Sequence, residues 1–228
     1  MSLPNTEPAT IRVDAKRQIS TLLTLPLRPR ASYVFAHGAG AGMKHPFMEA
    51  VAIALAMREI ATLRFQFPYM ESGSRRPDVP PLCHATVRAA VQEAARRCPG
   101  LPLIAGGRSF GGRMTSQAQA ASALPGVRGL AFFGFPLHPV GRPSDARANH
   151  LHSVALPMLF LQGTRDELAE LSLLHGVIDR LGPRATLKLM PDANHSFHVP
   201  ARSGGNDAQL IEELANAFSD WLLAAMSS

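Results

Sequence analysis

The sequence has few cysteines, no long apolar run and no basic stripe, and each shortage argues against a class of protein. Cys83 and Cys98 are the two cysteines in 228 residues, too few for a disulfide-rich secreted scaffold. They bracket one predicted helix and would lie about 22 Å apart on it, too far for a disulfide bond. No stretch approaches the roughly 20 apolar residues of a membrane span. The polar segment up to Asp14 lacks the layout of a signal peptide, so we expect a soluble, cytoplasmic protein with no membrane association.

The excess of positive charge does not indicate a nucleic-acid surface. The formal net charge is +6, and the basic residues, nearly all arginine, stand singly or in pairs such as Arg75-Arg76. The sequence has no basic stripe and no alternation of basic and aromatic residues. We therefore expect no nucleic-acid partner. We interpret the arginines as a solvated surface, and the functional alternative is a basic rim that favours anionic substrates.

The most informative motif is a serine between glycines at a predicted strand-to-helix turn. An apolar run at 101–105 predicts a buried strand, residues 113–120 predict a helix, and between them stands Gly107-Arg108-Ser109-Phe110-Gly111. A G-x-S-x-G sequence in this setting is typical of the nucleophile elbow of serine hydrolases. Side chains at the two glycines would collide with the neighbouring strand and helix. Ser109 is therefore the candidate nucleophile, and the alternative is a small residue in an ordinary tight turn.

Candidates for an acid and a base follow along the chain. Asp166 comes after one apolar strand-like run and His195 after the next. The order nucleophile, acid, base differs from the orders of the chymotrypsin and subtilisin folds. Three alternatives stay open: Asp166 as the N-cap of a helix that starts at Glu167, Asp192 as a rival acid in the loop of His195, and His195 as an ordinary surface histidine.

The sequence does not predict a metal or a cofactor. His195 and His198 lie close enough along the chain to suggest a metal pair, but no cysteine or acidic cluster accompanies them. Metal sites in proteins usually combine such ligands. We therefore expect a reaction carried by side chains alone.

A glycine-rich turn near the N-terminus predicts the second half of an oxyanion hole. The strand-like run 33–36 continues into His37-Gly38-Ala39-Gly40. Small residues after an early strand let backbone N–H groups approach a substrate oxygen closely. We expect the N–H groups of Ala39 and Phe110 to form the hole, with His37 stabilising the turn rather than acting as a base.

Strand-like and helix-like segments alternate along the chain after an expected N-terminal hairpin. This alternation predicts an α/β fold with a mostly parallel, twisted sheet and helices on both faces, in a single domain over residues 1–228. Residues 66–82 and 134–156 are rich in proline and arginine and predict long loops. Because 134–156 is short, we expect no inserted lid domain.

With these motifs in place, the chain resembles the α/β-hydrolase superfamily over 31–225. It looks nearest to the small lidless members close to dienelactone hydrolases and bacterial acyl esterases. The segments 63–69 and 106–113 are similar to a poorly characterised group in bacteria and animals, and some animal members of that group are chromatin-complex subunits. The resemblance implies an α/β-hydrolase fold with Ser109, Asp166 and His195 as the catalytic triad, and it implies no substrate.

Two features depart from better-known relatives. Many of them carry His or Tyr before the nucleophile, where this chain has Arg108. The substrates of those esterases are therefore not assigned to this chain. Serine at 109 argues against epoxide hydrolases and haloalkane dehalogenases, which use Asp there, and against a typical dienelactone hydrolase, which uses Cys.

We interpret the sequence as a serine hydrolase that cleaves a small ester or thioester through an acyl-enzyme. Peptidase and acyltransferase chemistry stay open, because water and other acceptors reach the same acyl-enzyme. The alternative from another class is a non-catalytic hydrolase-fold module that binds a partner. The animal relatives favour this alternative, whereas the intact set of triad residues argues against it.

The candidate substrate-binding residues lie in or beside the loops expected to frame the pocket. We expect Arg64, Tyr69 and Arg108 to contact substrate, and Arg75, Arg76 and Arg113 to add to the positive rim. Guanidinium groups pair well with carboxylates. The alternative is that these arginines are solvated or hold the loops through structural ion pairs.

Overall fold

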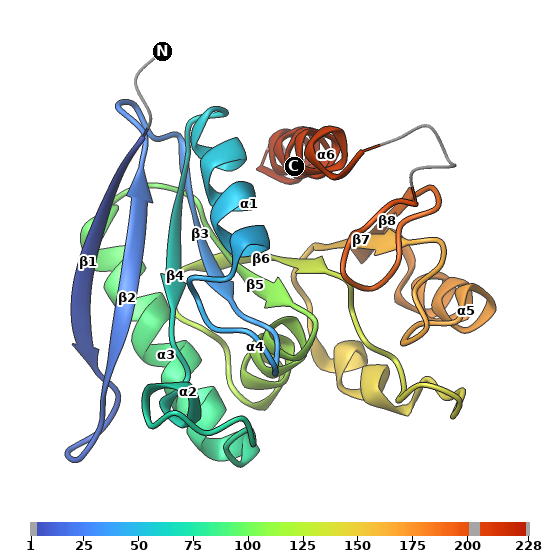
Figure 1. Ribbon diagram of the computed structural model, residues 1–228, viewed down its shortest axis with the longest axis horizontal. Coiled ribbons are helices and arrows are strands. Elements are labelled where there is room, and N and C mark those ends of the chain that lie inside the picture. The colour runs from blue at the N-terminus through green and yellow to red at the C-terminus, as the bar shows by residue number, and fades with distance from the viewer. Residues whose placement is uncertain (1–3, 201–205, 227–228) are drawn as a thin grey trace.

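The protein is built around one eight-stranded sheet (Figure 1). Its computed structural model describes residues 4–200 and 206–226. The strands lie in the order β1-β2-β4-β3-β5-β6-β7-β8. Their bounds are β1 Asn5–Arg12, β2 Gln18–Leu25, β3 Ala31–Ala36, β4 Ile60–Phe65, β5 Leu103–Arg108, β6 Val127–Phe133, β7 Met158–Gly163 and β8 Ala185–Met190. The predicted hairpin is present as β1 and β2, which pair antiparallel, and β2 continues antiparallel onto β4.

The six remaining strands are parallel, as the sequence predicts for the body of the sheet. Every residue of β3, β4, β5 and β7 is buried, because helices cover both faces of a sheet whose strands are joined by crossover helices. The carboxyl ends of the parallel strands meet at one edge, where an open α/β sheet places its ligands. The predicted α/β-hydrolase architecture is confirmed.

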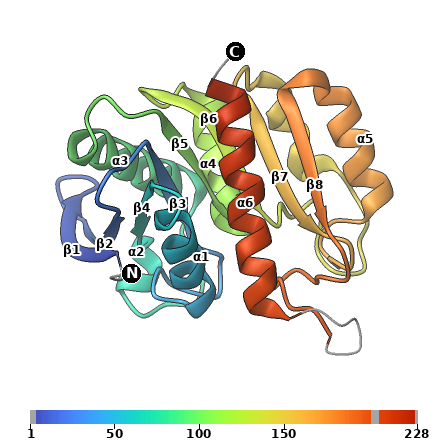
Figure 2. The same cartoon turned by 90° about the horizontal axis from the view of Figure 1, so that it is seen from above.

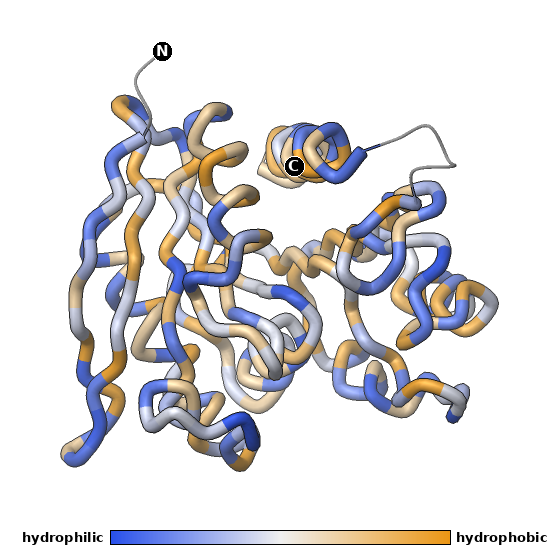
Figure 3. Tube along the Cα trace, viewed as in Figure 1, coloured by the Kyte–Doolittle hydropathy of each residue, from blue (hydrophilic) through white to orange (hydrophobic). Residues whose placement is uncertain are grey.

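Two helices cover one face of the sheet and three cover the other (Figure 2). On the first face, α1 (Pro46–Ala56) and α6 (Asp207–Met226) bury their apolar sides against Phe35, Phe133 and Leu161. On the second, α3 (Pro80–Arg97), α4 (Phe110–Ala121) and α5 (Leu171–Leu181) pack on Val34, Leu130 and Phe160. The helix α6 carries both apolar and polar residues (Figure 3). Its buried residues recur at helical spacing and are Leu210, Leu214, Ala215, Phe218, Trp221 and Leu222.

The two segments predicted as long loops contain short helices. In 66–82 the chain forms α2 (Pro68–Glu71) and then begins α3 at Pro80, because proline is favoured in the first turn of a helix. The prediction of a continuous loop is therefore wrong there. Residues 134–157, between β6 and β7, hold the 3₁₀ helix η1 (Ala146–Ser153) and no inserted lid. The remaining short element, η2 (Gly182–Arg184), leads into β8.

The structure bears on two expectations from the composition, unpaired cysteines and no membrane-spanning helix. Cys83 and Cys98 are buried free thiols at opposite ends of α3. No helix within the described residues is long and apolar enough to cross a membrane.

Three glycines bring β3, β5, β6 and α4 unusually close together. A Cβ added at Gly107 would lie 2.5 Å from the Ala36 carbonyl oxygen, and one at Gly111 would lie 2.5 Å from the carbonyl oxygens of Ala36 and His37. A Cβ at Gly106 would overlap the carbonyl group of Ala131 on the neighbouring strand. These are backbone atoms in a sheet, so they have little room to move aside.

We expect Gly106→Ala to destabilise the protein by about 1–3 kcal/mol or more, since over-packing a rigid site costs this much. Gly176→Ala is the matched control, because its Cβ would meet only the end of the Arg180 side chain, at 3.4 Å. That variant should gain up to about 1 kcal/mol from helix propensity. Urea unfolding of both proteins measures the difference, and a wild-type midpoint for Gly106→Ala would contradict the close approach of β5 and β6.

Candidate active site

Ser109 stands at the turn between β5 and α4 in a backbone conformation that residues with side chains rarely adopt. Its φ is 50° and its ψ is −116°. The Ser109 N–H donates to the Phe133 carbonyl at 3.1 Å, and the Ser109 carbonyl accepts from the Arg113 N–H at 3.1 Å. Such strain persists only where the surrounding structure over-determines it. The turn holds the hydroxyl, partly exposed, above the carboxyl edge of the sheet.

His195 reaches Ser109 from the loop that follows β8. Its Nε2 lies 2.8 Å from Ser109 Oγ, and its Nδ1 lies 2.7 Å from Asp166 Oδ2. Both distances are within hydrogen-bond reach, the first geometric requirement of a general base. Gly134, after β6, faces the imidazole ring and has a φ of 71°, a conformation that favours glycine.

Asp166 lies in the turn after β7, and its side chain is 1% exposed. Three groups hold its carboxylate: the Leu168 N–H donates to Oδ1 at 2.8 Å, while the Gln162 amide and His195 donate to Oδ2. The helix α5 begins at Leu171, so Asp166 closes the intervening turn and does not cap that helix. Asp166, His195 and Ser109 therefore form a continuous hydrogen-bonded chain.

The rival carboxylate does not take part in this chain. Asp192 is exposed and has a left-handed backbone conformation, with a φ of 57°. Its N–H donates to Thr164 Oγ1 at 2.9 Å, which fixes the turn beside His195. The imidazole therefore turns toward the buried Asp166 rather than toward its near neighbour in sequence.

Sequence reasoning missed the role of Gln162. Its Nε2 donates to Asp166 Oδ2, and its Oε1 accepts from the Phe135 N–H at 2.9 Å. The side chain thus ties the acid to the backbone that leaves β6. The signal in the sequence was an amide directly after the apolar run 158–161, since a polar group at the end of a buried strand needs hydrogen-bond partners.

The turn that carries Ala39 is held by a buried histidine and a buried tyrosine. His37 Nε2 accepts from the Phe67 N–H at 3.0 Å, so its Nδ1 carries the proton and donates to the Gly38 carbonyl at 2.8 Å. Burial lowers the pKa of His37 to about 4, which keeps the ring neutral near pH 7. The Tyr69 hydroxyl donates to the Ala39 carbonyl at 2.8 Å.

The structure brings this turn next to the serine. A Cβ added at Gly38 would lie 3.9 Å from Ser109 Cβ. Phe110 follows Ser109 directly and is the first residue of α4, so its N–H is one of the groups that a helix leaves without an internal partner. Gly38, which precedes Ala39, therefore lies beside Ser109, and Phe110 follows Ser109 at the start of α4.

Two of the three predicted substrate-binding residues serve the protein's own structure. The Arg64 side chain donates to the Met43 carbonyl at 3.2 Å and is 2% exposed. Tyr69 is equally buried and uses its hydroxyl to hold Ala39. In each case the partner lies more than 20 residues away in the chain, so the spacing of residues in the sequence does not predict the contact. The expectation that they line an open pocket is corrected accordingly.

Arg108, the third, lies on the face of the sheet that α1 covers. Its guanidinium carbon is 5.0 Å from the centre of the Phe47 ring, a cation–π distance. Burial lowers its pKa, and the negative charge of Asp166 acts in the opposite direction. Arg108 thus contributes positive potential beside Asp166.

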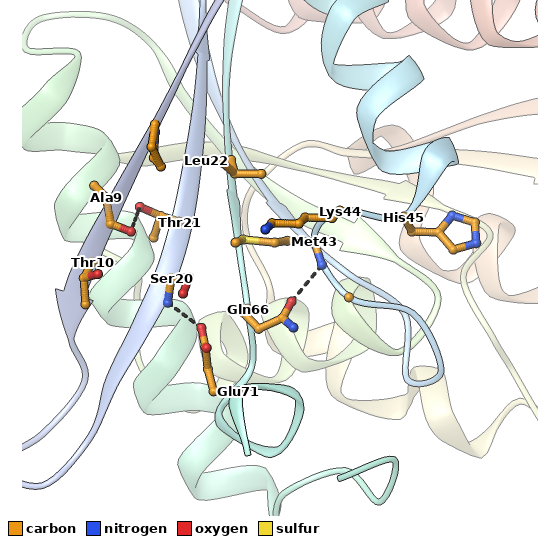
Figure 4. Close-up of a pocket in the computed structure, with 12 residues that line it drawn as sticks. Ala9, Thr10, Ser20, Thr21, Leu22, Met43, Lys44, His45, Gln66 and Glu71 are labelled. Atoms are coloured by element: carbon orange, nitrogen blue, oxygen red, sulfur yellow. Dashed lines mark hydrogen bonds between the residues drawn. The ribbon is translucent and has the colours of Figure 1, made fainter. Parts of the chain in front are cut away.

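A cavity of about 520 Å³ lies away from Ser109, between the β1–β2 hairpin and the segment before α1 (Figure 4). Met43, Lys44 and Gln66 line it, and the Gln66 side chain accepts from the Met43 N–H at 2.8 Å. Glu71 closes one side by accepting from the Ser20 N–H. Ser109, Asp166 and His195 do not line this cavity.

His198 does not share a site with His195. Its Nδ1 lies 2.9 Å from Asp207 Oδ2, in an exposed pair at the start of α6. Among the described residues, no group of three or more His, Cys, Asp or Glu is arranged to hold a metal ion.

Comparison with known proteins gives relatives of the same architecture. A dienelactone hydrolase from Anabaena variabilis matches with a TM-score of 0.78 and 20% identity, covering 98% of this chain and 99% of the other. A lidless α/β serine hydrolase from Xanthomonas campestris matches with a TM-score of 0.73 and 22% identity, over 97% and 98% of the two chains. Both likenesses are in fold.

A curated protein of Mycobacterium tuberculosis, provisionally named a phosphoribosyl transferase, is 29% identical over 208 residues. The match covers 88% of this chain and 42% of that protein, so this chain spans about two fifths of the length of its relative. The family described as alpha/beta hydrolase domain matches residues 29–223, a range that includes every element from β3 to most of α6. The chain belongs to the alpha/beta hydrolase family.

Proposed function

We propose that this hydrolase cleaves a small ester or thioester through an acyl-enzyme formed on Ser109. The observation that carries the proposal is the hydrogen-bonded chain from the buried Asp166 through His195 to the Ser109 hydroxyl. An ordinary hydroxyl is a poor nucleophile near neutral pH, and an adjacent base of this kind activates it. A non-catalytic module would have no need of this alignment.

The proposed reaction has two half-steps. Ser109 Oγ attacks the acyl carbon while His195 Nε2 takes its proton, and His195 then protonates the leaving group. Water next attacks the acyl-enzyme, gives its proton to His195, and releases the acid and free Ser109. Asp166 holds the proton-bearing Nδ1 of His195 and stabilises the imidazolium.

The oxyanion that develops in each half-step lies between the N–H groups of Phe110 and Ala39 in this proposal. Removing one such donor typically costs about 2.7–4 kcal/mol of transition-state stabilisation. His37 and Tyr69 support this indirectly, because they fix the turn that presents Ala39. The N-terminus of α4 adds a favourable dipole at the same place.

We expect Ser109→Ala to abolish ester hydrolysis and leave the fold intact. Turnover of p-nitrophenyl acetate should fall by at least about a thousandfold, as it does when a triad member that acts as part of a unit is removed. Thermal melting should stay close to wild type. Turnover within tenfold of the wild-type rate would rule out Ser109 as the nucleophile.

The acid is tested by a pair of matched substitutions. Asp166→Asn should lower kcat by roughly three to four orders of magnitude, because the amide favours the wrong tautomer of His195. Asp192→Asn is the control, since asparagine tolerates the left-handed conformation of that exposed residue. It should change kcat by less than about threefold, and the reverse ranking of the two variants would move the acid to the loop of His195.

The absence of an inserted lid predicts a preference for short acyl groups. The segments beside the site, α2 with its flanks and η1, carry proline and arginine rather than many large apolar side chains. They offer little surface for a long chain, which would gain about 0.8 kcal/mol per buried CH₂. In a series of p-nitrophenyl esters, kcat/KM should peak at acyl groups of about two to six carbons. Values that rise steadily beyond about eight carbons would contradict this account.

A further inference from the structure

Arg113 holds its guanidinium group against the ring of Phe110, the residue that directly follows the proposed nucleophile in the chain. It lies one helical turn after Ser109, about 6 Å along the helix axis, and its N–H donates to the Ser109 carbonyl at 3.1 Å. Its guanidinium carbon is 5.8 Å from the centre of the Phe110 ring. Phe110 in turn packs edge-on against Phe67 and Tyr69. Arg113 is thus connected through these rings to the turn that carries Ala39, which the Tyr69 hydroxyl holds.

Further positive or titratable groups from two other elements converge on Arg113. Burial lowers the pKa of Arg113, and the nearby charge of Arg147, on η1, lowers it further. His150, also on η1, reaches α4 through a contact of 2.7 Å between its Nε2 and Ser116 Oγ, one turn beyond Arg113. His84 adds a ring from α3, near enough to influence His150.

The pKa of His150 is lowered mainly by burial, and the charge of Arg113 and the neighbouring His84 lower it further, to about 4. The pKa of His84 is also lowered, mainly by burial. Both rings are therefore neutral near pH 7, which leaves Arg113 and Arg147 as the cations.

These cations have no carboxylate partner among the described residues. Other arginines do: Arg58 pairs with Glu212, Arg97 with Glu7 and Arg180 with Asp145. No salt bridge of Arg113 or Arg147 occurs in the part of the chain that the structure describes.

Two buried nitrogen atoms of these side chains are also without a hydrogen-bond partner within residues 4–200 and 206–226. The buried Nε of Arg113 and the buried Nε2 of His84 make no hydrogen bond with the described residues. The carboxylate of Asp78, which lies beside Cys83 on the same side of the site, accepts from the Tyr69 N–H at 2.8 Å. Two half-buried cations held together without an anion are unfavourable, and an incoming oxyanion would relieve that repulsion.

We propose that Arg113 and Arg147, with His84 beside them, form an anion subsite of the Ser109 centre, and that the substrate is an ester or thioester carrying a carboxylate or phosphate. This inference rests on the proposed hydrolase function and gives it a substrate class. The position of Arg113 one turn from Ser109 places the anionic group a few bonds from the scissile carbonyl. A guanidinium group suits this task, because its planar fork binds two oxygens of such a group at once.

The other arginines expected at the rim do not fill this role. Arg64 is held by Met43 on the opposite face of the sheet, and Arg108 stacks on Phe47 on that same face. Arg75 and Arg76 are exposed beyond α2. The subsite therefore belongs to the side of the sheet that α3, α4 and η1 cover.

The test compares matched anionic and neutral esters. One pair, 3-carboxyphenyl and 3-carbamoylphenyl acetate, carries the charge on the leaving group, and another, monoethyl adipate and ethyl adipamate, carries it on the acyl part. For the pair that fits the subsite, wild-type kcat/KM should favour the anion by about tenfold or more at low salt, in line with one charged hydrogen bond. Added salt should shrink this preference.

The variants Arg113→Gln and Arg147→Gln should each lower that ratio several-fold, and the double variant should bring it close to one. Arg128→Gln is the control, because it removes one exposed positive charge at the opposite end of β6, and it should keep the wild-type ratio. A wild-type ratio near one in both ester pairs, or an unchanged ratio in both single variants, would overturn the proposal.

A binding measurement separates this inference from the hydrolase proposal. Calorimetric titration of Ser109→Ala with 3-carboxyphenyl acetate or monoethyl adipate, and with their neutral partners, reports the anion preference without turnover. We expect one anion to bind at least about tenfold more tightly than its amide, and the preference to disappear in Ser109→Ala with Arg113→Gln. Equal binding of anion and amide in both pairs would refute the subsite, whether or not the wild-type protein hydrolyses neutral esters.

Discussion

The site depends on the strained turn at Ser109. A residue with a side chain at this φ and ψ carries a cost of about 1–3 kcal/mol, and hydrogen bonds with Phe133 and Arg113 on its two sides hold it there. The turn fits only because Gly107 and Gly111 let β5 and α4 approach the backbone of β3. The same approach brings the turn at residues 37–40 close to Ser109, so that this turn and the serine are positioned by one packing arrangement.

The two histidines near the serine have different chemistry because they have different surroundings. Both ring nitrogens of His37 are hydrogen-bonded to backbone groups, and the ring is neutral near pH 7, so His37 has a structural role. His195 lies between a buried carboxylate and a hydroxyl, and its side chain is 22% exposed. Burial thus falls from Asp166 toward the serine: three hydrogen bonds hold the buried carboxylate, whereas Ser109 is partly exposed.

Much of the architecture and the candidate site followed from local patterns. The bounds of β4, β6 and β8 agree with the strand-like runs in the sequence. Apolar runs mark the interior strands β4 and β6, and alternating apolar and polar residues mark the edge strand β8. The meeting of Ser109, Asp166 and His195 followed from the common edge at which parallel strands end. Contacts over long sequence separations did not follow: the burial of Arg64 against Met43 and the hydrogen bond between Gln162 and the Phe135 N–H require the folded packing.

The central claim is that Ser109 is an activated nucleophile, and covalent labelling tests it most directly. The protein would be treated with a fluorophosphonate and the modified peptide identified by mass spectrometry. The account predicts stoichiometric labelling at Ser109 that is lost when the protein is unfolded and strongly slowed in His195→Ala. A folded protein that stays unlabelled, or that labels at another residue, would contradict the account.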